Sequence, residues 1–275
     1  MAKEIKRHLL SLGYIQVDET RLDVLAKDKT YRGQLWVIND PRSKLVYYEY
    51  HNSRSKEAAK LLLGNYTGAL QTDAYSAYAD CGGVSIGCMG HARRYFVKAR
   101  KIASKDSKHA IKLIASLYGI EKKLSMAKIK LKSEQWYEKR LEVRQEKALP
   151  ILDKLKEYLI TIKDKYLIQD HPMTTAINYM LCRFDTFCNY TTDGRYQIDN
   201  NDIERSIRSV AIGRNNWLFA GSHNAAAINA GMMTVIQTCR KLKVNPYQYL
   251  YFVLPKLAAH TTTSLDGLTP MDWKN

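Results

Sequence analysis

The sequence has no long apolar run and little cysteine. No stretch of 18 or more apolar residues occurs in the 275 residues, which argues against a membrane-spanning helix. The first seven residues are mostly polar and charged, unlike the apolar core of a secretory signal peptide. Five cysteines form no paired framework, and an odd number favours a reducing compartment. These absences predict a cytoplasmic protein without membrane attachment.

Acidic residues are too few to balance the basic ones. The formal net charge is +16, and residues 91–150 alone carry 17 basic and 6 acidic side chains, a net +11. Such a balance favours a polyanionic partner, because neutralised phosphates release their counterions on binding. We expect Lys122, Lys123, Lys128 and Lys130 to carry part of this binding. The alternative is an ordinary basic protein with a solvated face.

The first third of the chain alternates strand and helix patterns. Residues 34–38 and 44–50 flank a turn-forming segment and predict a hairpin, and residues 54–63 predict a helix that Gly64 ends. Three further runs predict short strands: 14–18, 69–73 and 84–88. Two of these runs end on an acid, Asp18 and Asp73.

From His91 onward the pattern is helical. The residues 199–202 supply helix N-cap side chains, and Ile203, Ile207 and Val210 share one face of the helix that follows. Residues 213–221 predict a loop, and the next helices are expected at 223–241 and after Pro246. The pattern predicts an α/β unit interrupted by a helical insertion.

Asp18, Asp73 and Glu204 are the candidate catalytic residues. Two divalent ions can activate the attacking oxygen and stabilise the leaving oxygen in phosphoryl transfer, and magnesium prefers carboxylate ligands held on rigid elements. Two aspartates at strand ends and a glutamate on a helix meet this requirement. Taken singly, an aspartate at a strand end is more often a turn or cap residue.

The segments around these acids resemble successive motifs of the insertion-sequence 66 (IS66) family of transposases. The resemblance runs in order from about Gly13 to the end of the chain. It rests on Val17–Thr20, Gln71–Tyr78, Gly87–Phe96, Asp199–Arg208, Ile212–Ser222, Asn245–Leu250 and Leu268–Trp273.

The resemblance implies an α/β, RNase H-like fold, a mixed five-stranded sheet with flanking helices that is interrupted by a basic all-helical insertion. The first part of the catalytic core would span residues 1–90 and the insertion 91–195. The second part of the core would span 196–245 and carry the helix with Glu204, and a C-terminal tail would span 246–275. The family also implies a bacterial protein associated with the nucleoid.

The resemblance further implies a DDE transposase that uses two Mg²⁺ or Mn²⁺ ions. Asp18 would bridge the ions, while Asp73 and Glu204 would each hold one. Water would cut a phosphodiester at the element end, and the resulting 3′-hydroxyl would attack a target strand. The expected partners are transposon ends, target DNA and further copies of this chain. Two alternatives are a non-catalytic DNA-binding remnant and a structure-selective nuclease.

Several residues near the acids are candidates for DNA contacts. They are His91, Arg93, Arg94, Arg205, Arg208, Arg214 and Trp217. Cys88 and His91 have a ligand-like spacing, but the second pair that a structural zinc site needs is missing nearby. Trp217 and Phe219 could stack on an unpaired base, although we expect them to be core anchors.

The chain departs from the family at its N-terminus. Full-length members carry a long N-terminal region with a coiled-coil segment, a DNA-binding helical motif and a cysteine-rich metal site. About a dozen residues precede the first motif here. We therefore expect a truncated element or a fragment of a longer reading frame.

Overall fold

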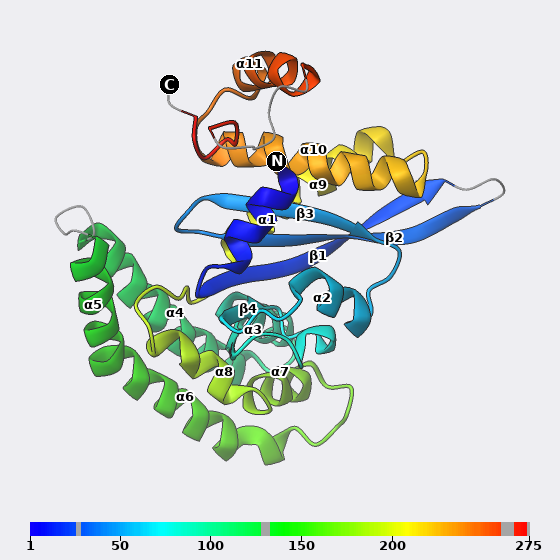
Figure 1. Cartoon of the computed structure of the whole chain (residues 1–275). Helices are drawn as coiled ribbons and strands as arrows, with labels where there is room; N and C mark the ends of the chain where they lie inside the picture. Colours follow the sequence, from blue (N-terminus) through cyan, green and yellow to red (C-terminus); the bar gives the residue numbers. More distant parts are fainter. Residues whose placement is uncertain (26–28, 128–132, 260–266, 274–275) are drawn as a thin grey trace. The chain divides into compact units, whose positions relative to one another are not determined.

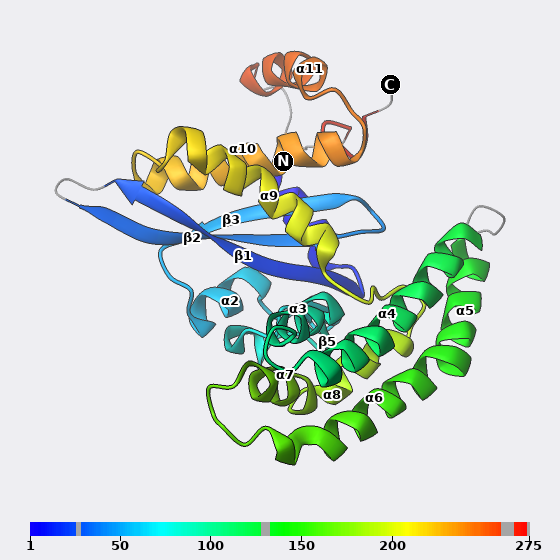
Figure 2. The same cartoon turned by 180° about the vertical axis from the view of Figure 1, so that it is seen from behind.

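The computed structural model describes residues 1–25, 29–127, 133–259 and 267–273. Five strands form one mixed sheet in the order β3-β2-β1-β4-β5, drawn in Figure 1 and from behind in Figure 2. Their bounds are β1 Tyr14–Leu25, β2 Thr30–Asp40, β3 Leu45–His51, β4 Ala69–Thr72 and β5 Val84–Gly87. The predicted hairpin is confirmed, since β2 and β3 pair antiparallel across the turn.

The first strand is longer than the sequence pattern predicts. β1 pairs antiparallel with β2 in an unbroken register from Gln16, opposite Asn39, to Leu25, opposite Thr30. The expectation that the strand ends on Asp18 is therefore wrong. Leu22 and Val24 are buried beyond it, and their apolar side chains on one face give the strand a reason to continue.

Five helices lie with β1, β2 and β3 in the first of two compact units, which comprises residues 1–70, 75–83 and 201–275. Their bounds are α1 Ala2–Leu10, α2 Lys56–Leu63, α9 Asn201–Trp217, α10 His223–Lys241 and α11 Pro246–Ala258. In Figure 1, α1 crosses the near face of the strands, whereas Figure 2 shows α9 across the opposite face. Gly64 ends α2 as expected.

The alternation of side chains along β1 and β2 builds a core on each face of the sheet. On one face Ile15 and Trp36 pack with Leu9 of α1. On the other face Leu22 and Val37 belong to a cluster that includes Ile203, Val210 and Ala226 of α9 and α10. Because strand side chains point alternately to the two faces, the buried apolar residues of β1 divide between the two cores.

The second unit comprises residues 71–74 and 84–200. Its helices are α3 Met89–Ala99, α4 Ser104–Ala127, α5 Ser133–Val143, α6 Leu149–Ile162, α7 Pro172–Leu181 and α8 Phe184–Cys188. Pro150 and Pro172 stand in the first turns of α6 and α7, where proline is tolerated. No strand falls within the described part of residues 91–195, which is the helical character that the sequence predicts there.

A buried ion pair holds the helices of this unit together. Arg144 is fully buried and its guanidinium lies 2.7 Å from a carboxylate oxygen of Glu121. Arg140 lies 2.7 Å from the other carboxylate oxygen. Arg144 also donates to the carbonyl oxygens of Tyr190 and Tyr196. Two of the basic residues in 91–150 therefore serve the core and are not available to a partner.

Among the described helices, none combines the length and the apolar character that crossing a lipid bilayer requires.

Candidate active site

Asp18 lies in the middle of β1, on the face of the sheet that α9 covers. Its register partner on β2 is Val37, and Val37 packs in one cluster with Ile203 and Val210 of α9. Directly opposed residues of an antiparallel pair project to the same face. Asp18 is half-buried, and its Oδ1 accepts a hydrogen bond of 2.8 Å from the backbone N–H of Glu19.

Glu204 stands in the first turn of α9, directly after the buried Ile203. The helix therefore carries Glu204 on the same face of the sheet as Asp18, and the structure places these two candidates in one unit. Glu204 is half-buried, like Asp18. The first turn is also where a carboxylate benefits from the positive end of the helix dipole.

Asp202 fixes the start of α9 to the rest of the first unit. Its Oδ2 accepts a hydrogen bond of 2.7 Å from Asn39 on β2 and lies 2.7 Å from Nζ of Lys241 on α10. Its Oδ1 lies 2.8 Å from the guanidinium of Arg205. Burial alone would raise the pKa of Asp202, but these donors outweigh it and hold the pKa below its usual value. Asp202 is thus engaged in an ion-pair network that orients the Glu204 helix.

Asp73 directly follows β4 and belongs to the second unit. The next residue, Ala74, has a φ of +69°, a left-handed backbone that a residue with a Cβ rarely adopts. The hydroxyl of Tyr179 on α7 donates a hydrogen bond of 2.9 Å to the carbonyl oxygen of Asp73. Strained backbone persists where the surroundings hold it, often at functional sites. Tyr179 is a residue that the sequence analysis missed, since a single tyrosine on a helix has no pattern around it.

Glu19 stands beside Asp18 in sequence but has partners of its own. The guanidinium of Arg54 and the hydroxyl of Tyr78 both donate to its carboxylate. The ring of Tyr75 packs against Arg54, whose guanidinium carbon lies 3.9 Å from the ring centre. Glu19 therefore links β1 to Arg54, just before α2, and to Tyr78.

Cys88 and His91 lie at the start of α3. Cys88 is fully buried at the N-cap position and accepts a hydrogen bond of 3.4 Å at its Sγ from the backbone N–H of Asn200. Ligand atoms of Cys88 and His91 lie within 4.8 Å of each other. Nearby, Asp199 accepts a hydrogen bond of 2.7 Å from the hydroxyl of Tyr118 on α4. These contacts all lie within the second unit.

The candidate DNA contacts fall on two helices in different units. His91, Arg93 and Arg94 lie in the first turns of α3, and both arginines are exposed. Arg205 and Arg208 are exposed on α9. The remaining two, Arg214 and Trp217, lie in its last turn, where the guanidinium of Arg214 donates to the carbonyl oxygen of Arg21.

The loop predicted for residues 213–221 is wrong in its first half, because α9 continues to Trp217. A glycine at position 213 leaves room for the indole of Trp217, which occupies the space that a side chain there would need. The expectation that Trp217 and Phe219 are core anchors is also wrong. Their exposed fractions are 36% and 39%.

A basic hollow lies in the second unit, at the start of α4. Four lysines line it: Lys105, Lys108, Lys112 and Lys165. The other lining residues are Ser104, Asp106, His109 and Tyr158. Asp106 accepts hydrogen bonds of 2.7 Å from the hydroxyls of Tyr158 and Tyr166. Of the lysines predicted from sequence, Lys122 and Lys123 lie exposed further along α4, whereas Lys128 and Lys130 lie outside the described residues.

The three candidate acids offer the same kind of donor atom. Asp18, Asp73 and Glu204 offer half-buried carboxylate oxygens, which are the hard donors that Mg²⁺ and Mn²⁺ prefer. The carboxylates come from a sheet and a helix, elements that hold side chains in place. These residue types therefore fit a carboxylate-bound divalent ion.

Comparison with known proteins identifies the family. A family model described as "Transposase IS66 family" matches residues 1–228. The chain belongs to this family.

Three curated relatives come from Sinorhizobium fredii (strain NBRC 101917 / NGR234). The chain is 33% identical to the uncharacterized protein y4hP over 98% of its own length and 52% of the relative's. It is 30% identical to the uncharacterized protein y4jD over 94% of its own length and 53% of the relative's. It is 30% identical to a third relative, the uncharacterized protein y4qI, over 94% of its own length and 50% of the relative's. The chain spans about half the length of the curated relatives it matches.

Proposed function

We propose that this chain is the catalytic part of a DDE transposase with an RNase H-like fold, which cuts DNA and joins the cut end to a target strand. The observation that carries the proposal is the placement of Asp18 on the sheet face covered by α9, the helix that bears Glu204. Asp73, directly after β4, would be the third carboxylate. In chain order, the acids would come from the first strand, the end of the fourth strand and a late helix, which is the order that an RNase H-like fold implies.

Asp18, Asp73 and Glu204 would hold two divalent ions, Mg²⁺ or Mn²⁺. When bound, such ions lower the pKa of water and neutralise charge that develops on the transferred phosphate. The chain's own residues position these ligands. The Asp202–Lys241 ion pair orients the first turn of α9, and the hydrogen bond from Tyr179 holds the peptide of Asp73. Water and later a 3′-hydroxyl would be the nucleophiles, so the reaction needs no covalent protein–DNA intermediate.

Basic side chains would hold the DNA. His91, Arg93 and Arg94 on α3 and Arg205, Arg208 and Arg214 on α9 would contact phosphates near the acids. The lysines of the hollow at the start of α4 would contact the backbone further along. Because strand transfer joins two ends, we propose that the active complex contains further copies of the chain.

Nicking of supercoiled plasmid DNA in millimolar Mn²⁺ tests the proposal without knowledge of the element's end sequence. The three variants Asp18→Asn, Asp73→Asn and Glu204→Gln should each lower the rate by about 10³-fold or more, because each removes several kcal/mol of transition-state stabilisation. DNA affinity, measured by fluorescence anisotropy, should not fall. Asp185→Asn is the matched control, since Asp185 is exposed on α8.

The second candidate is a DNA-binding remnant without catalytic activity, which the basic hollow favours. Salt-dependent binding of DNA without any metal-dependent nicking would select it. Equal nicking by the parent and by all three carboxylate variants would remove these residues from the active site.

A further inference from the structure

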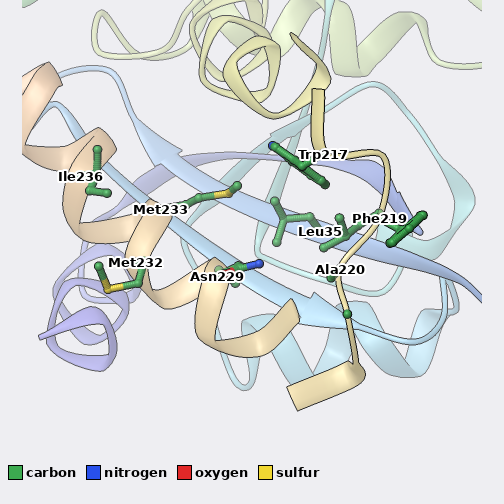
Figure 3. A pocket seen from close by; sticks show the side chains of 11 residues that line it. Leu35, Trp217, Phe219, Ala220, Asn229, Met232, Met233 and Ile236 are labelled. Atoms are coloured by element: carbon green, nitrogen blue, oxygen red, sulfur yellow. The ribbon is translucent and has the colours of Figure 1, made fainter. Parts of the chain in front are cut away.

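An apolar hollow lies in the first unit beside the end of α9. Its volume is about 350 Å³, close to the lower limit of sites that enclose small molecules. Figure 3 shows Leu35 of β2 at its centre, with Trp217 and Phe219 on one side and Met232 and Met233 of α10 on the other. Neither the ion-pair network at the start of α9 nor the candidate carboxylates line it.

The two aromatic side chains are held by a strained connection. After Trp217 the chain turns at Leu218, whose φ of +55° is left-handed although it is not glycine. Ala220 then pairs with β1, donating 2.8 Å to the carbonyl oxygen of Asp23 and accepting 2.8 Å from the N–H of Leu25. Such a backbone persists only where the surroundings determine it. The connection therefore presents Trp217 and Phe219 at fixed positions along the hollow.

Gly213 gives the indole its place. A Cβ at position 213 would lie 2.6 Å from Nε1 of Trp217, so the ring rests against bare helix backbone one turn earlier. The ring is nevertheless 36% exposed, and Leu218 and Phe219 beside it are 61% and 39% exposed. Large apolar side chains gathered at a surface hollow are typical of a binding site.

The end of α9 that borders the hollow belongs to a basic stretch of the sequence. The sequence from Arg205 to Leu265 contains no acidic residue, and its basic residues other than histidine are Arg205, Arg208, Arg214, Arg240, Lys241, Lys243 and Lys256. The nearest acid on β1, Asp23, is paired with Arg21 at 2.5 Å. An apolar hollow at the end of a helix that carries Arg205, Arg208 and Arg214 favours a ligand that joins a flat apolar ring to negative charge. A nucleotide has both parts.

We propose that this hollow receives one unstacked base of DNA, which packs against Trp217 and Phe219 while its phosphates meet the arginines of α9. Asn229 lines the hollow from α10 and offers a donor and an acceptor to the base edge. Stacking on aromatic side chains tolerates any sequence, because every base has a π-face. The inference rests on the proposed function in one respect, that DNA is the ligand.

The test compares two duplexes of equal length at fixed salt, one fully paired and one with a single unpaired thymine. The chain should bind the second about tenfold more tightly, in line with the stacking of one base on an aromatic ring. An abasic spacer in place of the thymine should remove the preference. Trp217→Ala should also remove it, whereas Tyr251→Ala should leave the affinity for both duplexes within about twofold.

Gly213→Ala keeps every aromatic residue and improves helix propensity, yet displaces the indole, so it should weaken the preference without loss of folding. Tyr251→Ala is the control, because Tyr251 is 76% exposed on α11.

An equal preference for the unpaired thymine in the parent and in Trp217→Ala overturns the inference. So does paired-duplex binding without any preference, which leaves the proposed function intact. Failure to bind either duplex overturns both. Binding of an acidic phenylalanine peptide that Trp217→Ala abolishes, without a base preference, would assign the hollow to a protein partner.

Discussion

Nζ of Lys241 lies 2.7 Å from Oδ2 of Asp202, which joins α10 to the first turn of the helix that carries Glu204. The two residues are 39 apart in the sequence. Asn39 donates to the same oxygen from β2. Three elements of the first unit therefore meet at one carboxylate, and its role is to hold Glu204 in place.

Lys241→Met should destabilise the chain by about 1–3 kcal/mol, because it leaves the half-buried carboxylate of Asp202 without its main counter-charge. Adding Asp202→Asn to Lys241→Met should recover part of the loss, which a double-mutant cycle in urea unfolding measures. Arg240→Met is the neighbouring control, since Arg240 is exposed. Equal effects of Lys241→Met and Arg240→Met would contradict the prediction.

Glu121→Gln should lower the free energy of unfolding by more, about 3–5 kcal/mol, because it leaves two buried guanidinium groups without their shared carboxylate. Arg144 is fully buried and Arg140 nearly so. Glu138→Gln, at an exposed site on α5, is the control. Urea unfolding followed by circular dichroism measures both variants. A loss below about 1 kcal/mol for Glu121→Gln would mean that the backbone carbonyls around Arg144 suffice.

Glu49 on β3 should make the stability depend on acid pH. Burial would raise its pKa, but hydrogen bonds from His51, Lys6 and Tyr47 lower the pKa to about 2 from the usual 4.5. Because the folded pKa lies below the unfolded value, the contribution is complete above about pH 4.5 and is lost as pH falls toward 2.

The free energy of unfolding should therefore separate the parent from Glu49→Gln by about 2 kcal/mol at pH 6, and the gap should narrow by pH 3. Unfolding by urea at a series of pH values gives the gap directly. A gap that stays constant between pH 6 and 3 would show that Glu49 acts through packing and not through its charge.

The sequence predicts most elements of this fold, because their patterns are local. The hairpin of β2 and β3, the helix 223–241 and the position of Glu204 on a helix all follow from periodicity and turn residues. The sequence does not reveal the full length of β1, because polar residues on its other face interrupt the apolar run. Only Leu22 and Val24, buried under α9 and α10, explain the extra length.

The contacts that orient the candidate site could not be predicted. The bond from Tyr179 to the peptide of Asp73 joins residues 106 apart. α9 continues to Trp217, whose indole rests against Gly213. Helix propensity disfavours glycine inside a helix, so the sequence does not predict this continuation. The exposure of Trp217 differs from the sequence-based expectation as well, because an aromatic residue in an apolar pattern is normally buried.

Salt dependence of DNA binding should reside in the hollow at the start of α4. Replacing Lys105, Lys108, Lys112 and Lys165 with glutamine should lower the slope of log affinity against log salt by about 2–4, at roughly 0.9 for each phosphate contact. The pair Lys122→Gln and Lys123→Gln tests the far half of α4, a helix about 36 Å long. If the pair changes the slope as much as the four together, the whole helix face binds DNA and the hollow has no special role.

Divalent ions should stabilise the chain through Asp73. Clustered carboxylates repel one another, so a bound cation relieves the repulsion and stabilises the folded state by mass action. Asp73→Asn removes one charge and keeps the shape of the side chain. It should fold as well as the parent in chelator, or slightly better, and lose most of the rise in Tm that millimolar Mn²⁺ gives the parent.

Tyr179→Phe should retain the rise in Tm but reduce nicking, because the hydroxyl of Tyr179 contacts the peptide of Asp73 and not its carboxylate. Asp185→Asn should retain both, as an exposed acid away from the candidate ligands. Thermal unfolding of the four proteins with chelator and with Mn²⁺ decides the matter. A parent without any metal-dependent shift, or a full shift in Asp73→Asn, would remove Asp73 from the proposed metal site and reduce the proposal to DNA binding.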